Sequence, residues 1–503
     1  MLIINDLTLT LKGNGRKIVD GLSITLSRGD KIAVIGEEGD GKSTLMRHLY
    51  DGRLTADYIT ATGSVIMRGA VGYMPQFASE TDGNTAVCDY IGNNVYDAIK
   101  YTDALALPAE LLYSTRRLSE LSGGERVKIR LFKLIADNPD VLLLDEPTND
   151  LDANTLEALE NFIIQTPKAV LFISHDATLL RRAARGIIHL EQVKRKTECR
   201  TTFAAVGYDE YIERRTAGIE RQTRIAFKQR EEFDAKMRRW QHIYDRVDHE
   251  QNTVSRQDPA GGRLLKKKMK SVLSQKRRFE RERENLAEAP DSEEAIITRF
   301  PASAVLPTGK TVLDLDISDL FAGDKPLAKN VRLTVTGNTK LAIVGANGVG
   351  KSTLLKEIKR TLDGRNDLRV SYMPQDYSEV LRSGTPLDYL DTVKGVDLTY
   401  ARQLLGNMRF TSAEMKCEIS ALSGGQQAKL IFLHAVLSNA NVLLLDEPTR
   451  NFSPLSSPAV CDALKGFGGA IISVSHDRTY IDEVCDTVYE LTENGLKLVR
   501  NDI

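Results

Sequence analysis

Cysteine and long apolar runs are scarce in this sequence of 503 residues. Its five cysteines are scattered and form no CxxC pair, which argues against zinc and iron–sulfur sites and favours a reducing compartment. No apolar run approaches the roughly 18 residues that a membrane-spanning helix needs. The opening residues, MLIINDLTLTLK, have neither the basic start nor the apolar core of a signal peptide. We therefore expect a cytoplasmic protein, for which a transport role would require a separate membrane partner.

The sequence also lacks an excess of either charge. Its formal net charge is −1, with 27% charged and 42% hydrophobic residues, which is ordinary for a globular protein and excludes a largely disordered one. Because overall neutrality can conceal an uneven distribution, charge has to be counted by segment. A chain of this length holds two or three domains, each with its own core.

Two α/β segments repeat each other. The first opens with LIINDLTLTL and KIAVIG before a glycine-rich loop, and the second has KLAIVG before another such loop. Strands alternating with helical stretches predict a largely parallel sheet. The pairs Ser122 and Ser423, Asp145 and Asp446, and His175 and His476 are each separated by 301 residues. This constant offset predicts duplicated α/β domains at 1–207 and 291–503, with 208–290 as a linker.

Each repeat carries a P-loop after a predicted strand, GEEGDGKST in the first and GANGVGKST in the second. Glycines let backbone N–H groups close around phosphates, the lysine neutralises phosphate charge, and the following serine is placed to bind Mg²⁺. An incidental glycine turn before Lys-Ser would explain one match, but not two in the same context. The predicted ATP-binding residues are Gly36, Gly39, Gly41, Lys42, Ser43, Thr44, Gly345, Gly348, Gly350, Lys351, Ser352 and Thr353.

Each repeat also contains VLLLDEP, at Val141–Pro147 and at Val442–Pro448. Four apolar residues predict a buried strand that holds the aspartate where it can coordinate Mg²⁺ through water. The glutamate that follows is placed to orient or deprotonate the attacking water. A helix cap or a solvated turn is the alternative for such a pair. The predicted catalytic glutamates are Glu146 and Glu447, beside the metal ligands Asp145 and Asp446.

A histidine and a glutamine complete each set. His175 and His476 follow the acidic pair at the same interval, which predicts catalytic sensors of the γ-phosphate, although a lone histidine beside a strand is more often structural. Gln76 and Gln375 lie between the P-loop and the acid, where either could reach the metal or the water. The full set of predicted metal ligands is Ser43, Gln76, Asp145, Ser352, Gln375 and Asp446.

The repeats share LSGGE at Leu121–Glu125 and LSGGQ at Leu422–Gln426, each at the start of a predicted helix. Ser-Gly-Gly at a helix start offers N–H groups and a hydroxyl to an anion. Because each domain already has a P-loop, a second anion site is useful if it serves the other domain's nucleotide. The predicted ATP contacts are Ser122, Gly123, Gly124, Ser423, Gly424 and Gly425.

In this order, these motifs resemble the ATP-binding cassette superfamily twice over, across roughly 1–200 and 311–503. The resemblance implies two cassettes that close head to tail over two ATP molecules. The first site would combine Lys42, Ser43, Gln76, Asp145, Glu146 and His175 with Ser423, Gly424 and Gly425. The second site would combine Lys351, Ser352, Gln375, Asp446, Glu447 and His476 with Ser122, Gly123 and Gly124.

Two departures from the family pattern predict that the sites differ. The first P-loop has Glu37, Glu38 and Asp40 where the second has Ala346, Asn347 and Val349. Acids near a triphosphate weaken its binding unless their side chains point to solvent. After the second acidic pair the chain reads PTRNFSPLS instead of PTNDLDANT, so Asp152 has no clear counterpart near Ser453. We therefore expect the two sites to hydrolyse ATP unequally.

The linker is predicted to be a helical hairpin. Apolar positions recur at steps of seven, or of three and four, on either side of the breaker DPAGG at Asp258–Gly262. The first seam is Ile212, Ile219, Ala226, Phe233, Met237, Trp240, Tyr244 and Val247, and the second is Leu265, Met269, Val272, Phe279 and Leu286. Two seams around a Pro/Gly turn predict antiparallel helices, the first about 40 residues and roughly 60 Å long.

Positive charge is concentrated in this linker. Residues 209–290 contain 21 Lys and Arg against 15 Asp and Glu, a net +6, which leaves −7 on the rest. The predicted RNA-binding residues are Arg263, Lys266, Lys267, Lys268, Lys270, Lys276, Arg277 and Arg278. A solvated coiled-coil face is the plain alternative. The nearby Trp240, His242, Tyr244 and His249 favour RNA, because they could contact bases or sugars.

Tandem cassettes joined by a charged helical linker, without a membrane domain, resemble the ABC-F group of translational ATPases. The resemblance implies a monomer that uses ATP and Mg²⁺ and binds the ribosome at the tRNA exit site. Its linker would approach the P-site tRNA and the peptidyl transferase centre, so the implied partners are rRNA and tRNA, with no DNA. About twenty residues separate Tyr50 from Val71, too few for the arm of some housekeeping members. This spacing, with the acidic P-loop and PTRNFSPLS, favours an antibiotic-resistance protein that protects the ribosome.

Three alternatives stay open at this point. A housekeeping ABC-F translation factor would have the same architecture. Some membrane importers use one ATPase chain with two cassettes, but that role needs no charged hairpin of about 80 residues, and a neighbouring permease gene would distinguish it. A DNA-repair or chromosome ATPase predicts zinc cysteines or a much longer coiled coil, neither of which the sequence contains.

Overall fold

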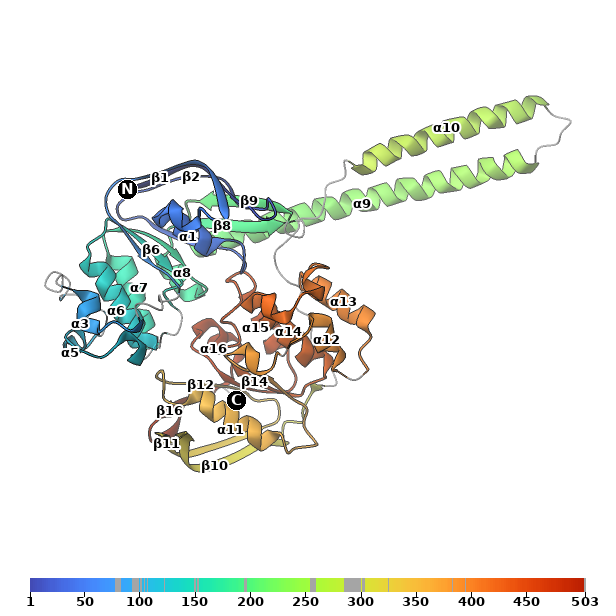
Figure 1. Ribbon diagram of the computed structural model, residues 1–503. Helices are drawn as coiled ribbons and strands as arrows, with labels where there is room; N and C mark the ends of the chain where they lie inside the picture. The colour runs from blue at the N-terminus through green and yellow to red at the C-terminus, as the bar shows by residue number, and fades with distance from the viewer. Residues whose placement is uncertain are drawn as a thin grey trace. The chain divides into compact units, whose positions relative to one another are not determined.

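The computed structural model describes residues 1–503 except 77–82, 93–98, 100–101, 104, 106, 122, 149–150, 152, 194–196, 254–258, 285–299, 301–303, 324, 382, 394 and 502–503. Residues 153–154, 259–262 and 284 are described by their backbone alone. The chain forms two compact units, Met1–Tyr208 with Glu293–Ile503, and Asp209–Ser292. The first unit contains two copies of an α/β domain, the first cassette before residue 208 and the second cassette after residue 300 (Figure 1).

The first cassette is built on a six-stranded sheet of order β5-β6-β7-β3-β8-β9, parallel except for the pair β8 and β9. Its strands are β3 (Lys31–Ile35), β5 (Val71–Met74), β6 (Val141–Asp145), β7 (Ala169–Ile173), β8 (Gly186–Val193) and β9 (Glu198–Ala204). An antiparallel sheet contains β1 (Leu2–Leu11), β2 (Lys17–Leu26) and β4 (Ile59–Met67). The helices are α1 (Lys42–Tyr50), α3 (Val87–Ile91), α5 (Ala109–Leu112), α6 (Gly123–Ala136), α7 (Ala153–Gln165) and α8 (Ala177–Ala183).

The second cassette repeats this architecture with the sheet order β13-β14-β15-β12-β16-β17, again antiparallel only at its last pair. Its strands are β12 (Lys340–Val344), β13 (Val370–Met373), β14 (Val442–Asp446), β15 (Ala470–Val474), β16 (Thr487–Thr492) and β17 (Gly495–Asn501), and β10 (Thr311–Ala322) and β11 (Lys325–Thr336) form a separate antiparallel pair. The helices are α11 (Lys351–Leu362), α12 (Pro386–Asp391), α13 (Leu398–Asn407), α14 (Gly424–Leu437), α15 (Ser457–Lys465) and α16 (Arg478–Val484).

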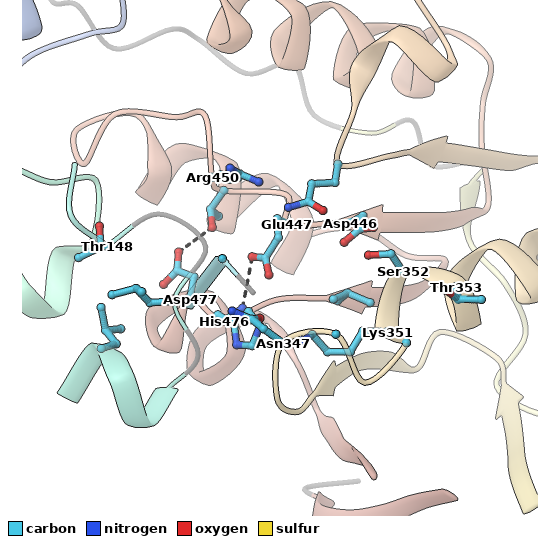
Figure 2. A pocket seen from close by; sticks show the side chains of 18 of the residues that line it. Thr148, Asn347, Lys351, Ser352, Thr353, Asp446, Glu447, Arg450, His476 and Asp477 are labelled. Atoms are coloured by element: carbon cyan, nitrogen blue, oxygen red, sulfur yellow. Dashed lines mark hydrogen bonds between the residues drawn. The ribbon is translucent and has the colours of Figure 1, made fainter. Parts of the chain in front are cut away.

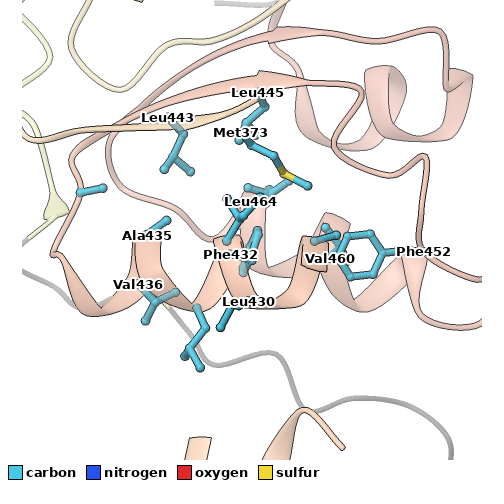
Figure 3. Packing of buried hydrophobic residues seen from close by; sticks show 14 of the residues in the cluster. Met373, Leu430, Phe432, Ala435, Val436, Leu443, Leu445, Phe452, Val460 and Leu464 are labelled. Carbon is cyan, nitrogen blue, oxygen red and sulfur yellow. The ribbon is translucent and has the colours of Figure 1, made fainter. Parts of the chain in front are cut away.

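Strand β14 shows how the sheet positions the acidic pair that follows it. All five of its residues are buried, as expected for a parallel strand covered on both faces. Because alternate side chains point to opposite faces, Leu443 and Leu445 pack in the cluster of Phe432 on α14 (Figure 3), whereas Val442 and Leu444 join the cluster on the other face. This packing on both faces fixes the end of the strand, where the acids lie.

The second unit is a pair of helices, α9 (Tyr208–Thr253, 46 residues) and α10 (Pro259–Glu284, 26 residues), which run side by side (Figure 1). Helix α9 is therefore about 70 Å long at 1.5 Å per residue. The predicted breaker is partly wrong, because Pro259–Gly262 form the first turn of α10, where a proline costs no hydrogen bond. Asp258 and Leu286 lie outside the described residues. With this change, the predicted fold of two α/β cassettes and a helical hairpin linker is confirmed.

The two predicted seams meet around the only tryptophan of the chain. Trp240, Val247 and Val272 are buried in one cluster, and Trp240 Nε1 donates to Val272 O at 2.9 Å. Tyr244 stacks on Trp240 with the ring centroids 5.3 Å apart. The expectation that Trp240 is available to RNA bases is therefore wrong, because its ring fills the space between the two helices.

Among the described helices, none combines the length and the apolar character that a membrane crossing requires.

The seam around Trp240 can be tested with Val272→Asp, which puts a carboxylate against the indole. A buried charge without a partner costs several kcal/mol, so the helices should separate locally and the emission of Trp240 should shift to longer wavelength. Leu273→Asp is the matched control, because Leu273 is 46% exposed and its side chain can carry charge into solvent. Equal emission spectra for the two variants would contradict this packing.

Candidate functional site

The two P-loops share one backbone conformation. Each links a central strand to a helix that begins at the lysine, β3 to α1 at Lys42 and β12 to α11 at Lys351. The preceding Gly41 and Gly350 have φ angles of 95° and 107°, in the left-handed region that favours glycine. A Cβ on Gly350 would also lie 2.7 Å from Leu327 Cδ1. Both constraints require glycine where the loop turns into the helix.

Each P-loop lysine is buried inside its own loop. Lys42 Nζ donates to Gly36 O, and Lys351 Nζ donates to Gly345 O, both at 2.8 Å. The lysines are only 6% and 8% exposed, respectively. A buried ammonium next to a helix N-terminus creates a positive potential that suits a polyphosphate.

A hydroxyl and a carboxylate meet beside each P-loop. Ser43 Oγ donates to Asp145 Oδ1 at 3.0 Å, and Tyr73 OH donates to Oδ2 at 3.2 Å. Burial raises the pKa of Asp145 to about 6. Burial also raises the pKa of Asp446, although a hydrogen bond from Ser352 acts in the opposite direction. Such hard oxygen donors suit Mg²⁺, and a cation there would favour the ionised carboxylates. These residues therefore fit the metal that the sequence predicts.

The two predicted catalytic glutamates have an uncommon backbone conformation. Glu146 and Glu447 have φ angles of 50° and 52°, in the left-handed region that glutamate rarely adopts. Such strain persists only where the surrounding structure compels it, and it is concentrated at functional sites. Burial raises the pKa of Glu447 to about 7, against a hydrogen bond from the backbone N–H of His476. A carboxylate of that pKa can accept a proton from water near neutral pH.

A cavity of about 600 Å³ lies at the second site, within the size range of small-molecule pockets. Both cassettes line it: Gly123 and Thr148 come from the first, and Lys351 and Glu447 from the second (Figure 2). The sequence-predicted residues that line it are Gly123, Gly348, Gly350, Lys351, Ser352, Thr353, Gln375, Asp446, Glu447, His175 and His476. Ser122 lies outside the described residues. Gly123 of one signature motif and the P-loop of the other cassette thus border the same cavity.

Sequence reasoning missed part of this lining. Ala322 of β10 and Lys325 and Leu327 of β11 form one wall, and Leu151 and Leu156 come from the first cassette. The two strands carry no motif, so no local signal could have identified them. His175 was assigned to the first site, yet it also borders the cavity at the second.

At the first site, Glu146 is held by two predicted partners. Gln76 Nε2 donates to Glu146 Oε2 at 2.9 Å, and His175 Nε2 lies 3.0 Å from Oε1. His175 Nδ1 lies 3.0 Å from Phe452 O of the second cassette. The histidine therefore connects the predicted water-activating carboxylate to the segment of the opposite cassette that follows its own acidic pair.

The acids of the first P-loop face the second cassette. Glu38 accepts hydrogen bonds from the backbone N–H groups of Gly424, at 3.1 Å, and of Gly425. Glu37 accepts from Ser453 Oγ at 2.6 Å. The cavity that these loops line together has a volume of only about 60 Å³. The sequence left open whether these acids point toward phosphate or toward solvent. In the structure, Glu37 and Glu38 point instead toward the second cassette.

The family model described as ABC transporter matches this chain twice, at residues 19–149 and 328–450, which together make up half of the sequence. Each match contains a P-loop, a signature motif and an acidic strand end. The chain belongs to the ATP-binding cassette family. As the family implies, it is an ATPase, whose cassettes use ATP and Mg²⁺.

Similar proteins confirm the resemblance to the ABC-F group. The ribosome protection protein VmlR of Bacillus subtilis (strain 168) is 27% identical over 495 residues, which cover 96% of this chain and 85% of that protein. A probable ATP-binding cassette sub-family F member 3 homolog of Encephalitozoon cuniculi (strain GB-M1) is 27% identical over 508 residues, with 99% and 82% covered. The crystal structure of an archaeal ribosome recycling factor, aABCE1, with the stalk protein aP1 matches with a TM-score of 0.61 and 18% identity, covering 96% of this chain and 87% of that one, and supports the fold alone.

The difference between the sites of this ATP-binding cassette protein predicts unequal effects of two matched substitutions. Glu447→Gln should lower kcat for ATP hydrolysis by about 10²-fold or more, because it removes the predicted base beside the cavity of about 600 Å³. Glu146→Gln should lower it by less than about tenfold, because the carboxylate of Glu38 already holds the N–H groups of Gly424 and Gly425 that a nucleotide at the first site would need. Phosphate release at saturating ATP and Mg²⁺ measures both, and equal losses would refute the difference.

Proposed function

We propose that this ATPase binds the ribosome at the tRNA exit site and directs α9 and α10 toward the P-site tRNA and the peptidyl transferase centre, where it dislodges ribosome-targeting antibiotics. The observation that carries the proposal is a long basic helical hairpin in a chain with two cassettes and, within its described part, no membrane-spanning helix. The similarity to VmlR, a ribosome protection protein, supports the same function. The ribosomal position and the antibiotic are inferred from the ABC-F resemblance.

The basic side chains of α10 are available for RNA. All eight predicted RNA-binding residues, namely Arg263, Lys266, Lys267, Lys268, Lys270, Lys276, Arg277 and Arg278, are exposed. The seam of the hairpin is apolar, so the charges lie on its outer surface. Of these residues, Lys276 lies over the Trp240 ring at 5.7 Å, which leaves its ammonium near the edge of the seam. A surface of this charge binds a phosphate backbone through the release of counterions.

ATP would couple this hairpin to the cassettes through the second site. Gly123 of the first cassette and Lys351 of the second line the same cavity, so a triphosphate between them would hold the cassettes together. Ser352, Asp446 and Gln375 would hold Mg²⁺, which supplies positive charge to the phosphates. Glu447 would accept the proton of the attacking water, and loss of the terminal phosphate would let the cassettes part. The protein would then leave the ribosome.

The first test is whether arrested hydrolysis traps the protein on the ribosome. The double variant Glu146→Gln, Glu447→Gln should co-sediment with ribosomes in ATP at close to one protein per ribosome, because ATP holds the cassettes together and is not cleaved. The same variant in ADP should stay in the supernatant.

The control for this experiment adds Lys351→Ala to the double variant, which removes the ammonium that would hold the triphosphate at the second site. It should abolish the trapping. Absence of the double variant from the ribosome fraction in ATP would contradict ribosome binding.

The hairpin charge is tested by reversing three lysines of α10. Lys266→Glu, Lys267→Glu and Lys268→Glu together should weaken ribosome binding at least about tenfold and reduce its salt dependence, because three phosphate contacts are lost. The matched control reverses Arg221, Arg224 and Lys228, three exposed basic residues of α9, with the same change in net charge. Equal losses for both variants would mean that general charge, and not this part of α10, drives binding.

The same pair of variants separates ribosome protection from housekeeping. Cells that carry the gene should tolerate ribosome-targeting drugs better than cells without it, and the α10 variant should lose that advantage. A growth defect without drug on deletion of the gene, with no change in drug tolerance, would favour the housekeeping role.

A further inference from the structure

The first and second P-loops differ in what they present to the opposite signature helix. At the first site, the carboxylate of Glu38 accepts hydrogen bonds from the N–H groups of Gly424 and Gly425, the first two residues of α14. At the second site, the matching residue is Asn347, whose Nδ2 lies 4.0 Å from the position of a Cβ on Gly124. One site thus brings a carboxylate to the opposite helix, and the other brings an amide.

The start of α14 is a place for an anion. The first N–H groups of a helix have no acceptor within that helix, and the helix dipole adds partial positive charge there. Two carboxylate oxygens on two successive N–H groups reproduce what two oxygens of a phosphate would do. A Cβ on Gly425 would lie 2.8 Å from Glu38 Oε2 and 2.7 Å from Asn451 O, so glycine is required for this approach. In the family arrangement, the same N–H groups serve the nucleotide bound to the opposite P-loop.

A second carboxylate strengthens the contact. Glu37 accepts from the hydroxyls of Ser453 and Ser456, and its Oε2 lies 3.5 Å from Lys429 Nζ. Burial raises the pKa of Glu37, but Lys429 and the two hydroxyls outweigh burial, so this pKa lies below its ordinary value. The carboxylate of Glu37 is therefore ionised and paired where it meets the second cassette.

The sequence shows a reciprocal exchange of acidic and small residues between the two sites. Ser453, which donates to Glu37, occupies the position that Asp152 occupies in the first repeat, 301 residues earlier. The P-loop residue that matches Glu37 is Ala346. Each composite site thus combines an acid from one motif with a small residue from the other, Glu37 with Ser453 at the first and Ala346 with Asp152 at the second. A glutamate at 37 facing an aspartate at 453 would place two like charges in contact, and serine removes that repulsion.

Asp40 adds a third acid within the same loop. Asp40 is 2% exposed, and its carboxylate accepts a hydrogen bond from the backbone N–H of Glu37 at 2.9 Å. Val349 stands at this position in the second P-loop. The first P-loop therefore buries an acidic side chain where the second has an apolar one.

We propose that Glu38 is a built-in substitute for the terminal phosphate of ATP at the first site. Its carboxylate holds the signature helix of the second cassette against the first P-loop, and ATP has to displace it to reach Gly424 and Gly425. The first site is then a standing contact between the cassettes, and the second site, with its cavity of about 600 Å³, is where ATP controls their separation. This inference rests on the ATP sites of the proposed function and not on ribosome binding.

Direct binding of ATP to the full-length chain tests the proposal, without ribosomes and in the Glu146→Gln, Glu447→Gln background to prevent turnover. Equilibrium dialysis with Mg²⁺ and ATP should find one tight site and a second at least about tenfold weaker. Glu38→Asn, which copies the second P-loop, should strengthen the weak site at least about tenfold. Asn347→Glu should weaken the tight site by a similar factor. Lys351→Ala identifies the second site by removing its binding.

The affinity for ADP distinguishes competition between Glu38 and the terminal phosphate from a general effect of the substitution on the loop. Because Glu38 occupies only the place of that phosphate, Glu38→Asn should leave the affinity for ADP within about twofold of its starting value. Glu38→Gln keeps the shape of the side chain and should behave like Glu38→Asn, which covers the case in which one variant folds poorly. Thermal unfolding followed by circular dichroism checks each variant.

Two equally tight ATP sites in the starting protein would overturn the proposal. An equal gain in affinity for ADP and for ATP in Glu38→Asn would also overturn it. A failure of ribosome co-sedimentation would leave the binding measurements unchanged, so the two ideas fail separately. Absence of ATP binding at both sites would overturn the site assignment and this inference together.

Discussion

The first N–H groups of a helix have no acceptor within that helix, and both sites of this protein depend on that constraint. Each signature helix begins beside the P-loop of the other cassette. At the second site, Gly123 borders a cavity large enough for a nucleotide. At the first, the backbone N–H groups of Gly424 and Gly425 donate to the carboxylate of Glu38, which lies 386 and 387 positions earlier in the sequence. One physical requirement is thus met in two ways within one chain.

The parallel sheets make this arrangement rigid. Strands β6 and β14 are buried along their whole length, so the acids at their ends are fixed by packing on both faces. The left-handed conformation of Glu146 and Glu447 carries a strain of about 1–3 kcal/mol, which the surrounding strands offset. Glu447 N donates to Val474 O of the neighbouring strand at 2.8 Å and so holds that conformation in place. The geometry of the two predicted catalytic glutamates thus depends on the packing of the core.

Much of this could be predicted from the sequence, because the signals are local. Motif spacing located the P-loops, the acidic strand ends and the repeat, and the seam periodicity located both helices of the hairpin. The segment with Pro259 is predicted to interrupt the helix because proline cannot continue one, yet proline is also favoured in the first turn of a helix, and only the backbone distinguishes the two. The burial of Trp240 depends on its partner across the hairpin, Val272, and the direction of Glu38 depends on a helix in the other cassette. Side-chain partners so distant in sequence leave no local signal.

The most direct measurement is an experimental structure of the full-length protein with Mg²⁺ and a non-hydrolysable ATP analogue. The account predicts nucleotide between Lys351 and Gly123, with the carboxylate of Glu38 still on the N–H groups of Gly424 and Gly425. At an analogue concentration that fills only the tighter site, a terminal phosphate on Gly424 and Gly425, with Glu38 turned away, would contradict the account. The comparison requires only that both sites are seen in one molecule.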